Sequence, residues 1–142
     1  SHYLADRFDE VAGVDSNASA IESAGHNIRL NPGRARRRFS VCDITAGSLP
    51  GVWRPLKPGR EVVILDPPRA GTGPGVIDCV AARRPQRAVH IFCNVDDIPR
   101  ALSEWKGGGY LPEGIVPLDM FPGTPNLEIA IAMKAAVRSP RG

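Results

Sequence analysis

Four residues that can bind or react with a ligand each follow a short apolar run: Asp15, Asp43, Asp66 and Cys93. Runs of this kind, separated by helical patterns, are typical of buried parallel strands. Ligands of open parallel sheets bind beyond the carboxyl ends of the strands, so these side chains are predicted to line one edge of one sheet. Carboxylates accept hydrogen bonds, and a cysteine thiolate is a nucleophile. For Asp15, a plain helix cap is an open alternative.

The sharpest motif is Asp-Pro-Pro-Arg-Ala-Gly at residues 66–71, directly after the apolar run at residues 61–65. The two prolines hold the backbone extended and stiff. Such a loop fixes the Asp66 carboxylate and presents the following residues to a ligand. The glycine-rich run at residues 71–75 fits neither the dinucleotide-binding nor the P-loop pattern, and we interpret it as a flexible connector.

Two later segments also carry residues that could do chemistry. The segment His-Ile-Phe-Cys-Asn ends with Cys93 and Asn94, and Pro-Leu-Asp-Met-Phe-Pro at residues 117–122 is followed by Thr124 and Glu128. By residue type alone, a free cysteine is more often a small buried hydrophobe than a nucleophile. An acid before an apolar strand is usually a solvated strand end. The order of the three segments along the chain favours a different interpretation.

Together, the three segments resemble those of the uracil-5 RNA methyltransferases, a class I family that uses S-adenosylmethionine. Asp-Pro-Pro after an apolar strand is similar to motif IV of class I methyltransferases, and the continuation Arg-x-Gly is similar to the uracil-5 members. The resemblance extends from about residue 3 to residue 134. The sequence departs from the family pattern at four positions: Phe92 replaces Ser, Val95 replaces Pro, and Gly123 and Asn126 stand where Gln or His is frequent.

The resemblance implies a covalent mechanism. The thiolate of Cys93 adds to C6 of uracil, which makes C5 nucleophilic toward the methyl group of S-adenosylmethionine. Glu128 is the implied base that removes the C5 proton, after which elimination frees Cys93. Asp66 is expected to orient the uracil or the cofactor amine. Three further residues are expected to contact the RNA substrate: Arg69, Asn94 and Thr124.

The same resemblance implies the cofactor contacts. Asp15 matches the acid that accepts hydrogen bonds from the ribose hydroxyls, and Asp43 matches the acid near the adenine amino group. S-adenosylmethionine is therefore the expected cofactor, and a tRNA or rRNA the expected partner. No metal site is expected, because the three cysteines have no paired spacing. We interpret the other two, Cys42 and Cys79, as core residues.

The elements that must position these residues predict an α/β fold. We expect a Rossmann-like class I methyltransferase sheet that is mostly parallel, with an antiparallel last strand. Helices are predicted between residues 16 and 31, at 76–82 and at 98–105, and the segment at 44–59 is predicted to be irregular. Strands are predicted at residues 11–14, 38–42, 61–65, 87–92, 110–117 and 127–133.

By the family's topology these strands would be ordered 3-2-(1)-4-5-7-6. Residues 1–10 supply neither the bracketed central strand nor its glycine-rich loop, and instead read as the final turns of a helix. We therefore expect the central strand to be missing from this chain. The strands beside it would either pair directly or leave a gap of about 9–10 Å, two strand spacings.

Composition excludes several classes of protein. The chain has 142 residues, 42% of them hydrophobic, and a formal net charge of +3. It has no apolar run long enough to span a membrane, no signal peptide, and neither a disulfide nor a disorder signature. We expect a partial catalytic domain at residues 1–136, a flexible tail at 137–142, a cytoplasmic location and a monomer. An arginine-rich run at residues 34–38 could bind phosphate, but a solvated loop before a strand is the favoured interpretation.

Two other functions stay open. A methyltransferase acting on cytosine C5 would also need a cysteine nucleophile, and the departures around Cys93 allow a degenerate domain that binds RNA without chemistry. The motifs favour the C-terminal catalytic part of a uracil-5 RNA methyltransferase. Because the glycine loop is missing, we expect this fragment to bind S-adenosylmethionine poorly and to be inactive alone.

Overall fold

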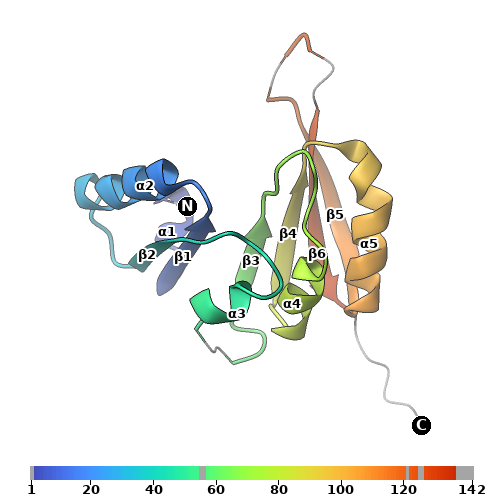
Figure 1. The fold of residues 1–142 in the computed structure, drawn as a ribbon, viewed down its shortest axis with the longest axis horizontal. Coiled ribbons are helices and arrows are strands. Elements are labelled where there is room, and N and C mark those ends of the chain that lie inside the picture. The colour runs from blue at the N-terminus through green and yellow to red at the C-terminus, as the bar shows by residue number, and fades with distance from the viewer. Residues whose placement is uncertain (1, 55–56, 121, 125–126, 137–142) are drawn as a thin grey trace. The chain divides into compact units, whose positions relative to one another are not determined.

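The computed structural model describes residues 2–54, 57–120, 122–124 and 127–136. The chain divides into two compact units, residues 1–53 and residues 54–142, and each unit contains its own sheet. Figure 1 shows the elements of both units in chain order.

The first unit is a parallel strand–helix–strand arrangement. Strands β1 (Glu10–Asp15) and β2 (Arg36–Val41) pair in parallel. Helix α2 (Ala18–Leu30) connects the two strands and contacts both. Two one-turn helices complete the unit, α1 (His2–Ala5) and α3 (Leu49–Val52).

The start of α2 shows how the end of β1 is held. The side chain of Asn17 caps the helix by accepting a hydrogen bond from the Ala20 N–H at 3.1 Å. The Asp15 carboxylate accepts from the Asn17 N–H at 2.8 Å, an Asx turn that leads the chain from strand to helix. The cap is therefore Asn17, and the alternative that Asp15 is a plain helix cap is wrong. The prediction that the helix ends at Asn31 is confirmed.

The second unit contains a mixed four-stranded sheet with the order β3-β4-β6-β5. Its strands are β3 (Val62–Leu65), β4 (Arg87–Phe92), β5 (Tyr110–Leu118) and β6 (Glu128–Ala135). Strands β3 and β4 are parallel, whereas β6 is antiparallel to both of its neighbours. The predicted antiparallel last strand is confirmed.

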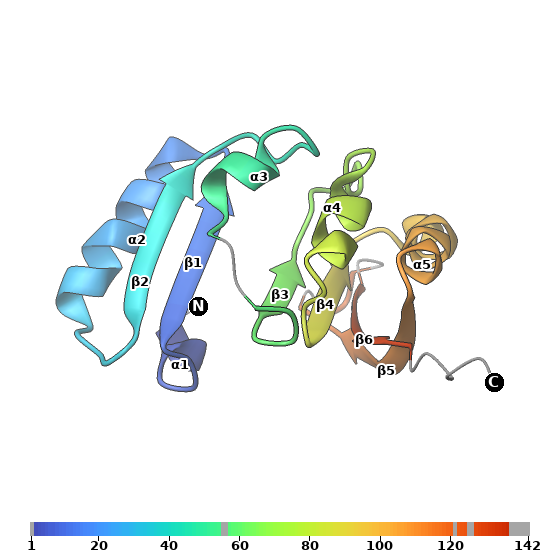
Figure 2. The ribbon, with the colours of Figure 1, turned by 90° about the horizontal axis from the view of Figure 1, so that it is seen from below.

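Helices α4 (Val76–Ala82) and α5 (Ile98–Gly107) pack together on one face of this sheet (Figure 2). A 3₁₀ turn, η1 (Val95–Asp97), joins β4 to α5. Between the helices and the sheet lie the largest fully buried side chains, among them Trp105, Ile77, Ile131, Met133 and His90. None of the helices in the described part of the chain is long and apolar enough to cross a bilayer.

The strand order agrees with the prediction on both sides of the bracketed strand. Written with the labels of the structure, the predicted order is β2-β1, a missing strand, then β3-β4-β6-β5, and these are the two sheets observed. In the described part of the chain, β1 and β3 belong to different sheets. Among the described residues, each of these strands keeps one edge without a strand partner. The four residues that were predicted to line one edge of one sheet therefore follow strands of two separate sheets.

Candidate active site

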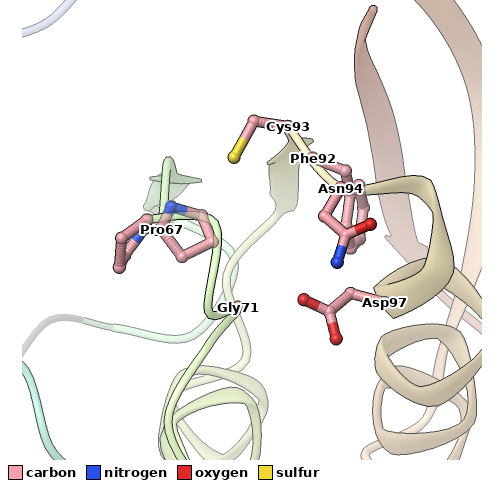
Figure 3. A pocket seen from close by; sticks show the side chains of 7 residues that line it. Pro67, Gly71, Phe92, Cys93, Asn94 and Asp97 are labelled. Carbon is pink, nitrogen blue, oxygen red and sulfur yellow. The ribbon is translucent and has the colours of Figure 1, made fainter. Parts of the chain in front are cut away.

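A small pocket lies at the carboxyl ends of β3 and β4, entirely within the second unit (Figure 3). One wall is the loop after β3, which contributes Pro67, Pro68 and Gly71. The facing wall is the chain that leaves β4, and it contributes Phe92, Cys93, Asn94 and Asp97. The loop of the Asp-Pro-Pro motif and the candidate nucleophile therefore face one another, as the parallel strand arrangement predicts.

The Cys93 side chain is half-buried and its sulfur points toward the loop that carries Pro67 (Figure 3). Strand β4 ends at Phe92, so Cys93 is the first residue beyond the strand. The register of β3 and β4 places Leu65 opposite His90, which brings the residues after Leu65 alongside Phe92. The backbone itself therefore sets Cys93 against the proline loop.

Gly71 lets the proline loop approach the opposite wall. Its backbone has φ +81°, in the left-handed region that favours glycine, and its N–H donates to the Pro68 carbonyl at 2.8 Å. A Cβ atom at this position would collide with the Asp97 carboxylate. The glycine of the motif therefore has two physical reasons: a left-handed backbone conformation, and a close approach to η1 that a side chain would permit only by displacing the Asp97 carboxylate.

Asn94 and Asp97 place polar groups on the wall beside Cys93. The Asn94 side-chain oxygen accepts from the Asp96 N–H at 3.2 Å and so caps η1. This contact occupies its oxygen and leaves its NH₂ group to donate. The Asp97 carboxylate lies 3.6 Å from the Arg100 guanidinium and is directed toward the pocket (Figure 3).

The other predicted catalytic and RNA-contacting residues lie outside the pocket lining. Asp66 and Arg69 are exposed on the loop after β3, and Thr124 is exposed in the turn before β6. Glu128 is half-buried and is the first residue of β6. Three predicted features lie outside the described residues: Phe121 of the Asp-Met-Phe-Pro segment, the departure at Asn126 and the tail at residues 137–142.

The two predicted cofactor acids of the first unit share one sheet edge. Asp15 ends β1 opposite Val41, and Asp43 follows β2 two residues later. Both side chains are exposed. Since the Asn17 N–H occupies only one Asp15 oxygen, the pair offers several acceptor sites for hydroxyl or amino donors. The two carboxylates, which only accept hydrogen bonds, are chemically suited to bind ribose hydroxyls and an adenine amino group.

The arginine run before and within β2 makes contacts inside the first unit. Arg38 donates to the Glu10 carboxylate at 2.8 Å and to the Val52 carbonyl at 3.2 Å. Arg37 donates to the Asn31 carbonyl at 2.7 Å, and Arg36 lies 3.7 Å from Glu10. These contacts favour the structural interpretation of the run over a phosphate site.

Sequence reasoning missed three polar residues at or below the pocket: Asp97, Thr72 and His90. Asp97 precedes a helix and reads as an ordinary N-terminal acid. His90 is 1% exposed, and burial lowers its pKa from 6.5 to about 4, with the Arg100 charge as a second cause and Asp97 acting in the opposite direction. Its alternation with Ala88 and Phe92 along β4 was the available signal that it faces the core.

Comparison with curated proteins finds relatives named as RNA methyltransferases. An uncharacterized RNA methyltransferase of Geobacter sulfurreducens is 35% identical over 98% of this chain and 28% of its own length. One of Halalkalibacterium halodurans is 34% identical over 90% of this chain and 27% of its own. The chain therefore spans little more than a quarter of these relatives. No protein-family model matches it.

Comparison with solved structures also finds methyltransferases. The tRNA (uracil-54, C5)-methyltransferase of Pyrococcus abyssi, in complex with S-adenosyl-L-homocysteine, has TM-score 0.72 and 32% identity over 94% of this chain and 31% of its own. The precorrin-6y C5,15-methyltransferase of Geobacter metallireducens is similar in fold alone, with TM-score 0.55 and 15% identity over 95% of this chain and 85% of its own.

The fold and the strand-end position of the pocket define the chain as a class I methyltransferase-like α/β structure. Its sequence is homologous to that of RNA methyltransferases, one of them a tRNA uracil C5 enzyme. The resemblance inferred from the three motifs is thereby confirmed.

Proposed function

We propose that this chain carries the active site of an RNA methyltransferase that acts on C5 of uridine, with Cys93 as the nucleophile. The observation that carries the proposal is the position of Cys93: it is the first residue after β4, half-buried, and faces the Asp-Pro-Pro loop across the pocket. A thiol on a pocket wall, rather than in the core, is placed to attack a flat ring that enters from the sheet edge.

In the proposed reaction the thiolate of Cys93 forms a bond to uracil C6, and the electron pair of the C5–C6 double bond makes C5 nucleophilic. The Asp15 and Asp43 carboxylates would hold S-adenosylmethionine, from whose sulfur C5 would take the methyl group, with S-adenosylhomocysteine as the leaving group. Glu128 accepts the proton of C5, and the C6–sulfur bond then breaks to restore the double bond and the thiolate. Asp66 orients the uracil ring or the cofactor amine.

The remaining polar residues would hold the RNA. The Asn94 amide, whose oxygen is used in capping η1, donates from its NH₂ group to an acceptor on the substrate. Arg69 and Thr124 are exposed on the loops at the same end of the second unit and would contact the RNA backbone. We propose that residues 1–136 act as one catalytic domain.

The test is covalent capture on RNA containing 5-fluorouridine, with the whole protein that carries these residues. Fluorine at C5 blocks proton removal, so the methylated adduct stays bound and is seen as a protein–RNA band. Cys93→Ser is expected to abolish the band. Cys79→Ser, which alters another half-buried cysteine of the same unit, is the matched control and is expected to keep it.

Methylation of uridine at C5 by the Cys93→Ser variant would contradict the proposal. Nucleoside analysis of the product identifies the methylated base, because 5-methylcytidine would show that the substrate is cytidine and not uridine. An intact protein that binds RNA with no adduct and no methylated nucleoside would indicate a non-catalytic domain.

We also propose that the 142 residues alone bind S-adenosylmethionine weakly and do not turn over. The support is that β1 and β3 each lack a strand partner on one edge among the described residues, and that the relatives are more than three times as long. Calorimetric titration of the isolated chain and of the whole protein tests this. Sustained methyl transfer by the isolated chain would contradict it.

A further inference from the structure

A buried chain of polar contacts lies directly beneath the pocket. The imidazole of His90 is 1% exposed and contacts two polar side chains, Thr72 and Trp105. Thr72 Oγ1 lies 2.9 Å from His90 Nε2, and Trp105 Nε1 lies 3.2 Å from His90 Nδ1. Thr72 is itself 7% exposed. Buried polar side chains are costly unless paired, and here each partner has one.

The chemistry of the partners fixes the proton on His90. An indole N–H can only donate, so His90 Nδ1 must be the acceptor and carries no proton. The single proton of the neutral ring is therefore on Nε2, which donates to Thr72 Oγ1. A second proton on the ring would place two donors against each other at Trp105. The contacts thus hold one tautomer of a neutral histidine.

His90 connects the two walls of the pocket from below. Thr72 follows Gly71 on the proline-loop wall, and its hydroxyl is hydrogen-bonded to His90 Nε2. On the other wall, the His90 ring stacks on Phe92 with centroids 4.0 Å apart. Phe92 lines the pocket and directly precedes Cys93.

The same loop residue is also held from α5. Arg100 donates to the Thr72 carbonyl at 3.4 Å and lies 3.6 Å from the Asp97 carboxylate, which lines the pocket. Thr72 is thus fixed through its side chain by β4 and through its backbone by α5. Both contacts therefore hold the residue that directly follows Gly71 of the proline loop.

We propose that Thr72 and His90 are positioning residues that set the separation between the proline loop and Cys93. This inference rests on the proposed function, in which Cys93 must reach a ring held against that loop. Neither residue lines the pocket, so they act through Phe92 and the loop backbone. Displacement of a reacting group by about 1 Å can lower a rate by about 100-fold.

The test compares Thr72→Val with Thr72→Ser in the whole protein. Valine keeps the shape of threonine but lacks the hydroxyl, whereas serine keeps the hydroxyl. We expect Thr72→Val to lower kcat about 10-fold or more and to leave KM for RNA and for S-adenosylmethionine nearly unchanged, because Thr72 does not line the pocket. Thr72→Ser is expected to restore most of kcat.

A second pair of variants acts on the histidine itself. The amide of Gln stands near the position of Nε2 and that of Asn near Nδ1, so His90→Gln can keep the contact to Thr72 and His90→Asn only the contact to Trp105. The proposal expects more kcat in His90→Gln than in His90→Asn. The reverse order, or equal kcat in Thr72→Val and Thr72→Ser, would overturn it.

A third measurement separates this inference from the proposed function. The rate at which iodoacetamide alkylates Cys93 needs no RNA and no methyl transfer. A loosened wall exposes the thiol, so Thr72→Val is expected to react several-fold faster than wild type, and Thr72→Ser like wild type. If wild type forms no adduct with 5-fluorouridine RNA, the proposed function fails, and these alkylation rates still decide the positioning role. Equal rates in all three proteins would refute that role.

Discussion

Lowering the pH from 7 to 5 is expected to destabilise the second unit through His90. Burial, with the Arg100 charge adding to it and Asp97 opposing it, lowers the folded-state pKa of His90 from 6.5 to about 4. Between these two values the unfolded chain binds a proton at this histidine and the folded chain does not. Stability is therefore full above pH 6.5, falls as the pH drops toward 4, and then levels off.

The size of the effect follows from the proton difference. A displacement of the pKa from 6.5 to about 4 corresponds to about 3 kcal/mol at the plateau. Integration from pH 7 to pH 5 gives a loss of about 2 kcal/mol in the free energy of unfolding. Above pH 4 the folded state keeps the ring neutral, and a proton on Nδ1 would face the Trp105 Nε1–H, which is also a donor.

Urea unfolding at pH 7 and pH 5, followed by tryptophan fluorescence, measures this loss. Trp105 is a direct reporter because it contacts the histidine. His90→Gln removes the titrating ring and is expected to reduce the loss between the two pH values by about 2 kcal/mol. His26→Gln, at an exposed position on α2 of the other unit, is the matched control and should behave as wild type. Equal losses in wild type and His90→Gln would refute the reasoning.

Two further predictions concern Gly71 and Glu113. Alanine at a left-handed position costs about 1 kcal/mol, so Gly59→Ala, at φ +75° with open space around it, should lose about that much in thermal unfolding. Gly71→Ala, whose new methyl group also meets the Asp97 carboxylate, should lose clearly more stability than Gly59→Ala. Adding Asp97→Ala to Gly71→Ala should recover the excess loss. Equal losses at the two glycines would contradict the steric argument. A hydrogen bond from Arg87 lowers the pKa of Glu113 to about 2, so its stabilisation is present above pH 4.5 and lost as the pH falls toward 2. Glu113→Gln should remove that part of the acid dependence, and a carboxyl NMR midpoint near its ordinary value would contradict it.

The strands could be predicted from the sequence because local composition determines them. Strand β4 and helix α4 have the predicted bounds, and the other predicted strands agree within two residues at each end. Their order followed from the topology of the family that the motifs resemble. Helix α3 was not predicted, because a single turn of four residues, Leu49–Val52, is too short to show a helical period.

The polar layer under the pocket could not be predicted from the sequence. Thr72 and His90 are separated by a loop and a helix, and their contact depends on how α4 returns the chain to β4. No local pattern signals such a pair, and each residue alone reads as ordinary. Asp97 is a similar case: its place in the pocket depends on the close approach of Gly71. Local patterns predict elements, whereas contacts across loops depend on packing.

The antiparallel direction of β6 explains how residues from distant parts of the chain reach one edge. The last residues of the parallel strands β3 and β4 lie at that edge, whereas an antiparallel strand has its first residue there. Phe92, the last residue of β4, pairs with Ile129, and Glu128 precedes Ile129 as the first residue of β6. The antiparallel register therefore places Glu128, the proposed base, at the sheet edge where β4 ends and Cys93 follows. A one-residue shift of β6 would turn Glu128 to the other face of the sheet, so a variant that changes this register should lose proton removal while adduct formation at Cys93 persists.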